Sequence, residues 1–327
     1  MKHLAVIIIL LAGIVPSTQA QSGYQIPRDT TYTVYQSLIK NQKDYPQAKP
    51  ARAILPKGVK AEMELVYDEL IDSEGNSRKL HVDLFRPDGK GIFPAVVMVH
   101  GGGWRSGDKS MQVPMAMKLA EQGFVAIAVQ YQLSLEAQYP QAVYNIKSAI
   151  RWARANASRF GIDTSRIAIS GCSAGGQLAA LVGMTNGLSQ FEGNLGNKGY
   201  SSHVHAVMNI DGVVDFLAPA SLNKERKPNS ADESWLGGSF LEKPGVWRDA
   251  SAIFWVNKHS PPILFLNSGF SRFHAGQDEM IGMLKEFGIY YEVHTFDVKV
   301  HPFWLFHPWF EPTVEKMTNF LDKVFSE

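Results

Sequence analysis

The sequence has 327 residues, and its 32 Lys and Arg against 31 Asp and Glu give a formal net charge of +1 at pH 7, with 45% hydrophobic and 19% charged residues. This composition is typical of a globular protein. The near-neutral balance, without long runs of like charge, argues against binding to nucleic acid or to an anionic membrane surface. Cys172 is the single cysteine, which excludes an intramolecular disulfide and a cysteine-rich metal site.

The first residues have the pattern of an export signal. A basic start precedes an apolar run over residues 4–15 and a small-residue stretch over residues 16–20. The apolar run is too short to span a bilayer comfortably. We therefore expect residues 1–20 to be a cleaved signal peptide, and residues 21–327 to be secreted or periplasmic without a membrane partner after cleavage. An uncleaved anchor is the alternative.

Residues 21–60 are polar, rich in tyrosine and without a clear hydrophobic period. We expect them to form an N-terminal arm draped over the rest of the protein, and we assign no chemistry to them. Residues 61–327 are expected to form one domain, since α/β folds often reach this size as a single unit.

After the arm, β-type runs alternate with helical patterns. The eight candidate strands are Met63–Tyr67, Leu80–Phe85, Ala95–Val99, Val125–Val129, Ile167–Ser170, Val204–Ile210, Ile263–Asn267 and Tyr291–Phe296. The candidate helices are Val113–Gln122, Gln141–Ser158, Ala174–Met184, Gln277–Phe287 and Pro312–Phe325. The later strands are almost continuously apolar, as in parallel strands that are covered on both faces. The alternation predicts a parallel α/β sheet.

Prolines and glycines interrupt this alternation over residues 216–258, between two of the candidate strands. We expect an insertion there. In open α/β sheets ligands bind outside the carboxyl ends of the strands, and the insertion is expected to lie over that edge.

A Gly-x-Ser-x-Gly sequence centred on Ser173 lies between a candidate strand and a candidate helix. This context is typical of a nucleophile on a tight strand-to-helix turn, where Gly171 and Gly175 leave room for the neighbouring backbone. The amino end of the helix that begins at Ala174 favours developing negative charge. The alternatives are an ordinary glycine-rich turn, and Cys172 as the nucleophile. A buried free cysteine, however, is more often inert.

The strand that ends at Val99 is followed by His-Gly-Gly-Gly-Trp over residues 100–104. Successive glycines allow the backbone to turn its N–H groups toward the oxygen of a carbonyl group attacked by Ser173. With the N–H of Ala174 they form an oxyanion hole. His100 is expected to order this loop and to take no part in catalysis.

The two glycine-rich motifs together resemble the α/β-hydrolase superfamily, and within it the esterases related to hormone-sensitive lipase and to bacterial carbohydrate esterases. The resemblance covers roughly residues 80–325. It implies the α/β-hydrolase fold, with a mostly parallel eight-stranded sheet covered by helices. It also implies that Gly102 and Gly103 are the oxyanion donors on the strand side.

The superfamily order is serine, acid, histidine, with the histidine in a loop after the last strand. His301 follows the last candidate strand and is therefore the expected base. His294 lies within that strand and is interpreted as a packed or edge residue. His307 is too distant, and is interpreted as a substrate contact or a structural hydrogen-bonding group.

The acid departs from the family pattern. Ser271 stands where relatives carry an aspartate after the seventh strand. Asp211, at the carboxyl end of the sixth candidate strand, is our predicted acid, since some superfamily lipases take their acid from that place. Asp215 is interpreted as structural, and Asp211 could instead only cap a loop. Asp297, Asp278 and Glu279 remain possible acids.

The sequence after His301 is aromatic, and flat aromatic faces pack well against sugar rings. This run, together with residues 271–276, looks like esterases of plant cell-wall breakdown in bacteria. The expected substrate contacts are Trp104, Arg272, His274 and Trp304. The guanidinium of Arg272 could bind a sugar hydroxyl or a uronate carboxylate.

We therefore expect a secreted serine esterase that removes acetyl groups from an acetylated carbohydrate such as xylan or pectin through an acyl-enzyme. No cofactor is expected. His203 and His205 alternate on one strand face without an accompanying carboxylate, so no metal site is expected there. The alternatives are an exported serine exopeptidase and a non-catalytic, hydrolase-like carbohydrate-binding protein. The oligomeric state stays open.

Overall fold

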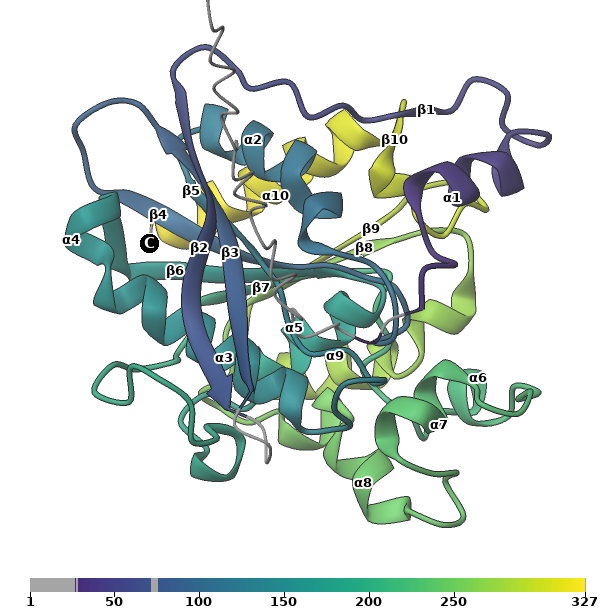
Figure 1. The fold of residues 1–327 in the computed structure, drawn as a ribbon. Helices are drawn as coiled ribbons and strands as arrows, with labels where there is room; N and C mark the ends of the chain where they lie inside the picture. Colours follow the sequence, from purple (N-terminus) through teal and green to yellow (C-terminus); the bar gives the residue numbers. More distant parts are fainter. Residues whose placement is uncertain (1–26, 28, 72–75, 327) are drawn as a thin grey trace, which may run out of the picture.

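The computed structural model describes residues 27, 29–71 and 76–326, so the predicted signal peptide lies outside the described residues. An eight-stranded sheet in the order β2-β3-β5-β4-β6-β7-β8-β9 forms the centre (Figure 1). Its strands are β2 Val59–Ile71, β3 Ser77–Pro87, β4 Phe93–Val99, β5 Val125–Val129, β6 Ile162–Cys172, β7 Ala206–Ile210, β8 Ile263–Asn267 and β9 Tyr291–Thr295. β2, β3 and β5 pair antiparallel, and the pairs from β5 through β4 to β9 are parallel.

The parallel strands are buried on both faces. Every residue of β5, β7 and β8 is buried, which explains why these strands are almost wholly apolar in sequence. Each of the eight predicted strands is found within a few residues of its predicted position, and the prediction of a mostly parallel eight-stranded sheet is confirmed.

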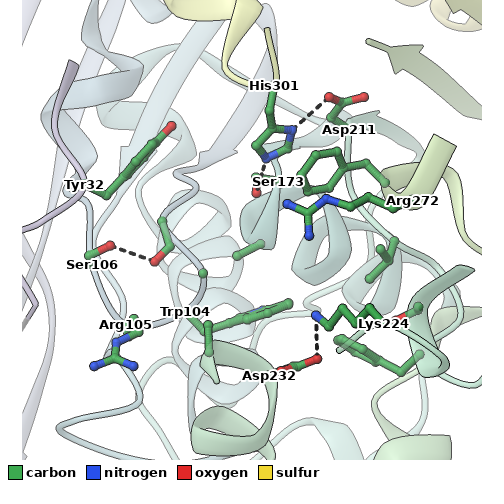
Figure 2. Close-up of a pocket in the computed structure, with 18 of the residues that line it drawn as sticks. Tyr32, Trp104, Arg105, Ser106, Ser173, Asp211, Lys224, Asp232, Arg272 and His301 are labelled. Carbon is green, nitrogen blue, oxygen red and sulfur yellow. Dashed lines mark hydrogen bonds and ion pairs between the residues drawn. The ribbon is translucent and has the colours of Figure 1, made fainter. Parts of the chain in front are cut away.

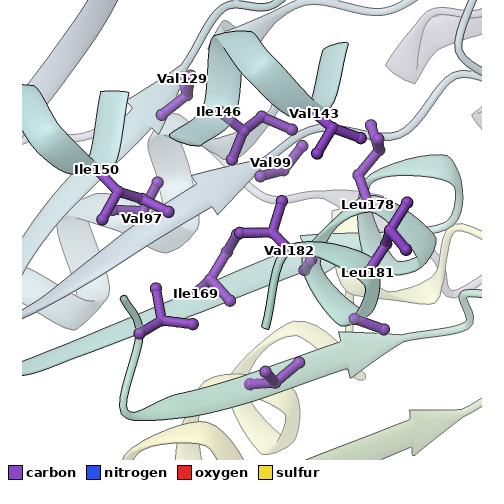
Figure 3. Packing of buried hydrophobic residues seen from close by; sticks show 14 of the residues in the cluster. Val97, Val99, Val129, Val143, Ile146, Ile150, Ile169, Leu178, Leu181 and Val182 are labelled. Carbon is purple, nitrogen blue, oxygen red and sulfur yellow. The ribbon is translucent and has the colours of Figure 1, made fainter. Parts of the chain in front are cut away.

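Helices cover both faces of the sheet. α3 Gln141–Ala155, α5 Ala174–Met184 and α9 Gln277–Glu286 lie on one face, and α2 Val113–Glu121 and α10 Phe310–Phe325 lie on the other (Figure 1). Successive residues of β4 alternate between two core clusters: Val97 and Val99 pack with α3 and α5 (Figure 3), whereas Val96 and Met98 pack with α2 and α10. The predicted helix over 141–158 is divided, because α3 ends at Ala155 and the short α4 Ala157–Phe160 follows.

The arm contains structure that its lack of period did not predict. It forms α1 Val34–Asn41, and β1 Lys49–Pro50 pairs with β10 Phe306–His307. The N–H of Asp29 donates to the carbonyl of Arg105 over 3.0 Å, and the N–H of Lys299 donates to the hydroxyl of Tyr45 over 2.9 Å. The arm is therefore fastened to the loops that follow β4 and β9.

The predicted insertion is found between β7 and β8. It contains three short helices, α6 Pro219–Leu222, α7 Ala231–Leu236 and α8 Pro244–Asp249 (Figure 1). Trp235 and Trp247 are fully buried and join this segment to the core: Trp235 stacks on Trp104 at 5.0 Å, and Trp247 meets the edge of Phe216 at 5.9 Å. No helix among the described residues has the length and apolar character that crossing a membrane requires.

Candidate active site

Ser173 occupies a strained turn between β6 and α5. Its φ of +55° and ψ of −121° lie outside the backbone conformations that residues other than glycine ordinarily adopt. A Cβ on Gly171 would lie 2.0 Å from the carbonyl oxygen of Gly175, and a Cβ on Gly175 would lie 2.2 Å from that of Val99. Only glycine fits at both positions, which is the physical reason for the Gly-x-Ser-x-Gly spacing.

His301, in the loop after β9, faces the serine. Its Nε2 lies 2.7 Å from the Oγ of Ser173, which is the hydrogen-bond distance that a general base for this hydroxyl requires. The ring of Phe273 stacks on the imidazole at 3.4 Å between centroids, and the ring of Trp304 meets its edge at 5.3 Å. Two aromatic rings therefore fix the plane of the imidazole.

Asp211 lies immediately after β7 and faces His301 from the other side. Its Oδ2 is 2.9 Å from the Nδ1 of His301, and its Oδ1 accepts a hydrogen bond from the N–H of Ser268 over 2.7 Å (Figure 2). The Nε2 of His274 lies 3.4 Å from Oδ1. The other carboxylates considered lie elsewhere: Asp297, Asp278 and Glu279 are exposed, and Asp215 accepts from the N–H of Leu217.

The electrostatics suit a neutral base beside an ionised acid. Burial would raise the pKa of Asp211, but its contacts with His274, His301 and Ser268 outweigh burial and lower that pKa below its usual range. Burial lowers the pKa of His301, against the opposing effect of Asp211. The Nε2 atom is then free to accept a proton from the serine hydroxyl at neutral pH.

The glycine loop after β4 lies beside the serine. Gly102 and Gly103 have φ values of +122° and +59°, and a Cβ on Gly102 would meet the carbonyl oxygen of Ser106 at 2.1 Å. Gly102, Gly103 and Ala174 all line the cavity that contains Ser173. The Nδ1 of His100 lies 2.8 Å from the carbonyl oxygen of Gly101, and this contact helps to fix the conformation of the loop.

A cavity of about 330 Å³ opens in front of Ser173 (Figure 2), and we call it the acyl pocket. Trp104 and Phe216 form an aromatic wall. Two ion pairs lie at its rim: Lys224 with Asp232 from the insertion, at 2.7 Å, and Arg105 with Asp29 from the arm, at 3.1 Å. Thr31 and Tyr32 of the arm also line the cavity, as do Arg272 and Phe273.

Two of the four expected substrate contacts are placed differently by the structure. Trp104 and Arg272 line the acyl pocket, but Trp304 is 2% exposed and packs in the core behind His301. His274 faces Asp211 and does not line the pocket. The aromatic run after His301 anchors the loop to α10, so the expected aromatic wall comes instead from Trp104, Phe216 and other parts of the chain.

Several residues were missed because nothing in the local sequence marks them. Asp29, Thr31 and Tyr32 reach the pocket from the arm, to which no chemistry was assigned, and Lys224 and Asp232 reach it from the insertion. Only the interruption by prolines and glycines over residues 216–258 pointed to this edge of the sheet.

The remaining candidates make structural contacts. Cys172 is fully buried next to Gln112, burial raises its pKa, and it does not line the acyl pocket. His294 contacts Glu292 at 3.0 Å, and His307 contacts Glu311 at 2.7 Å. Within the described ranges, no group of three or more His, Cys, Asp or Glu side chains is placed to hold a metal ion.

The chain is similar to known esterases. Residues 82–281, more than half of the sequence, match the family model described as BD-FAE. Over 175 residues the chain is 34% identical to Esterase LipC of Mycobacterium tuberculosis, an alignment that covers 53% of this chain and 43% of that protein. The alignments cover less than half of the length of LipC and of two further mycobacterial esterases, LipQ and LipM.

Solved structures share the fold. A truncated carbohydrate esterase from gut microbiota matches with a TM-score of 0.68 at 22% identity, over 85% of this chain and 99% of that one. A bifunctional GH43-CE protein of Bacteroides eggerthii matches with a TM-score of 0.67 at 25% identity, over 81% of this chain and 38% of that one. The α/β-hydrolase fold that the two glycine-rich motifs predicted is confirmed.

The contacts of Asp211 lead to a direct comparison of carboxylates. Asp211→Asn keeps the shape but offers Nδ1 the wrong hydrogen-bonding partner, so kcat for p-nitrophenyl acetate should fall by up to ~10⁴-fold. Asp297→Asn makes the same chemical change on an exposed residue of the histidine loop and should leave kcat within about threefold. A crippled Asp297→Asn beside an active Asp211→Asn would reverse the assignment.

The lowered pKa of His301 has a measurable consequence. The base acts only when neutral, and because its pKa lies below the ordinary 6.5, the midpoint of the fall of kcat/KM in acid should lie below pH 6.5. The pH profile of kcat/KM measures this midpoint in the free enzyme. A midpoint at or above 6.5 would contradict the account of His301.

Proposed function

The chain belongs to the BD-FAE family, and we propose that it is a serine carboxylic-ester hydrolase that removes small acyl groups, acetyl first, from plant cell-wall polysaccharide. One observation carries the proposal. The Oγ of Ser173, the imidazole of His301 and the carboxylate of Asp211 are in hydrogen-bond contact, in series, at the wall of a cavity. A protein that only bound carbohydrate would have no need of this series.

The proposed reaction is acyl transfer. The Oγ of Ser173 attacks the ester carbonyl while the Nε2 of His301 takes the hydroxyl proton, and Asp211 stabilises the resulting imidazolium. The negative carbonyl oxygen faces the N–H groups of Gly102, Gly103 and Ala174. The ester C–O bond then breaks, and the sugar alcohol leaves with the proton from Nε2. Water, activated by the same nitrogen, hydrolyses the acyl-enzyme and releases acetate.

The size of the acyl pocket supports a second candidate. An acetyl group has three heavy atoms and fills roughly 90 Å³, taking three times the volume share of a water molecule. The cavity of about 330 Å³ is larger, and Trp104 and Phe216 give it an aromatic wall. An ester of a larger, aromatic acid is therefore the second candidate substrate.

The predicted export of the protein supports an extracellular substrate. A cell-wall polysaccharide is found outside the cell, and the predicted signal peptide over residues 1–20 would bring the enzyme there. We place the catalytic domain in residues 61–327 and treat residues 21–60 as an arm that contributes Asp29, Thr31 and Tyr32 to the pocket.

The nucleophile is tested by a pair of neighbouring substitutions. Ser173→Ala removes one hydroxyl and should lower kcat for p-nitrophenyl acetate by about 10⁴-fold or more, with an unchanged circular dichroism spectrum. Cys172→Ala, one residue away, should keep most of the activity because the thiol lies outside the pocket. Near-wild-type turnover by Ser173→Ala would refute the serine-esterase proposal.

The acyl group is tested by a series of substrates. Acetate release from acetylated xylan, pectin and mannan is measured beside hydrolysis of p-nitrophenyl esters of two to eight carbons and of methyl esters of hydroxycinnamic acids. The first candidate predicts the highest kcat/KM on acetyl esters. Higher kcat/KM on the aromatic esters would replace it with the second candidate.

A further inference from the structure

A second hollow of about 510 Å³ lies next to the acyl pocket, along α1, and we call it the α1 groove. From the arm it is lined by Gln36, Ser37, Lys40 and Asn41 of α1, together with Thr31 and Tyr32. From the catalytic side it is lined by Phe270, Arg272, Phe273, His301 and Pro302.

The α1 groove and the acyl pocket meet at the base. His301, Arg272 and Phe273 line both hollows, as do Thr31 and Tyr32, whereas Ser173 and the glycines of the oxyanion loop line only the acyl pocket. His301 is therefore the one member of the Ser173–His301–Asp211 series that faces both spaces.

The direction of proton transfer assigns the α1 groove its ligand. In acyl transfer the leaving alcohol receives its proton from the Nε2 of His301, so the alcohol oxygen must lie against that atom. The acyl carbon lies at Ser173 beside the oxyanion donors, in the acyl pocket. The remainder of the alcohol then extends past His301 into the α1 groove.

The charges of the two hollows differ. At the rim of the acyl pocket, Lys224 and Arg105 are each paired with an aspartate. The α1 groove has two cations, Lys40 and Arg272, and no Asp or Glu lines it. Within the part of the chain that the structure describes, neither cation forms an ion pair with a carboxylate, and the guanidinium of Arg272 lies 4.0 Å above the ring of Phe273.

The other groups in the α1 groove suit a sugar. The side-chain amides of Gln36 and Asn41 can donate to and accept from hydroxyl groups, and the ring of Phe270 offers apolar surface to a pyranose. The two faces of the Phe273 ring are covered by His301 and Arg272. A planar guanidinium beside such groups can bind a carboxylate through two parallel hydrogen bonds, in a bidentate arrangement.

We propose that the α1 groove binds the sugar side of an acidic glycan, with a uronic acid carboxylate on Arg272 and Lys40. This inference rests on the proposed function and narrows it. Among cell-wall polysaccharides it selects acetylated galacturonan and glucuronate-bearing xylan over neutral mannan. Lys40 and Arg272 act as specificity-determining residues that bind the leaving group outside the reacting centre.

The test is competitive inhibition of p-nitrophenyl acetate hydrolysis by trigalacturonate and by neutral xylotriose. In the wild type we expect trigalacturonate to have the lower inhibition constant, and we expect that constant to rise with added NaCl. The readout for each variant is the ratio of the two constants, which cancels any general loss of activity. Lys40→Gln and Arg272→Gln should each shift this ratio by about tenfold or more toward xylotriose, as for the loss of one charge-assisted hydrogen bond.

Two controls sharpen the result. Lys43→Gln removes a charge from an exposed lysine just beyond α1 that does not line the groove, and it should leave the ratio unchanged. Propane-1,2,3-tricarboxylate carries three carboxylates without sugar rings and should inhibit at least tenfold less strongly than trigalacturonate. Equal inhibition by the two acids would overturn the assignment of the groove to a sugar.

Other outcomes separate this inference from the proposed function. Equal inhibition of the wild type by xylotriose and trigalacturonate, or a ratio unchanged in Lys40→Gln, would overturn the groove assignment while leaving the esterase in place. A wild type that does not hydrolyse p-nitrophenyl acetate would refute the esterase proposal alone. Calorimetric titration of that protein with trigalacturonate would then decide the groove: binding weakened in Lys40→Gln supports it, and no binding overturns it.

Discussion

The hydrogen bond between His301 and the buried carboxylate of Asp211 is the contact on which the rest of the site depends. It joins residues 90 positions apart, one after β7 and one after β9. Asp211 is 1% exposed, so losing the hydrogen bond with His301 would leave one oxygen of a buried carboxylate without its partner, at a cost of about 1.5–3 kcal/mol. Because this contact fixes the loop after β9, it also fixes the arm, which is attached to that loop through Tyr45 and through the pairing of β1 with β10.

His301 then divides the space in front of the sheet into two hollows with different chemistry. On the side of Ser173, Lys224 and Arg105 are each paired with an aspartate and the wall is aromatic, while Arg272 lies between the two hollows and lines both. On the side of α1 the cations Lys40 and Arg272 have no carboxylate among their neighbours in the groove. An ester has two halves, and this division lets acyl group and alcohol be selected by separate parts of the chain.

Features that depend on local backbone geometry could be predicted from the sequence, whereas features that depend on packing between segments far apart in the chain could not. The turn at Ser173 was predictable because glycines 171 and 175 are required by close backbone approach. Asp211 could be predicted as the acid because Ser271 occupies the position where relatives carry an aspartate, and Asp211 lies at the end of a neighbouring predicted strand. The expectation that Trp304 contacts the substrate was wrong. An aromatic residue close to the base in sequence can either line the pocket or pack in the core, and here Trp304 packs in the core cluster that includes α10. The arm residues, Tyr32 and Lys40 among them, were missed because their contacts are made with segments far along the chain.

The proposed role of Ser173 as the nucleophile of an ester hydrolase is tested most directly by reaction with diethyl p-nitrophenyl phosphate. This compound transfers its diethylphosphoryl group to an activated serine and releases nitrophenolate. Mass spectrometry of the intact chain and its peptides should find one diethylphosphoryl group per molecule, on Ser173, in proportion to the loss of esterase activity. An active chain that carries the label on another residue, or that loses activity without labelling of Ser173, would contradict the account.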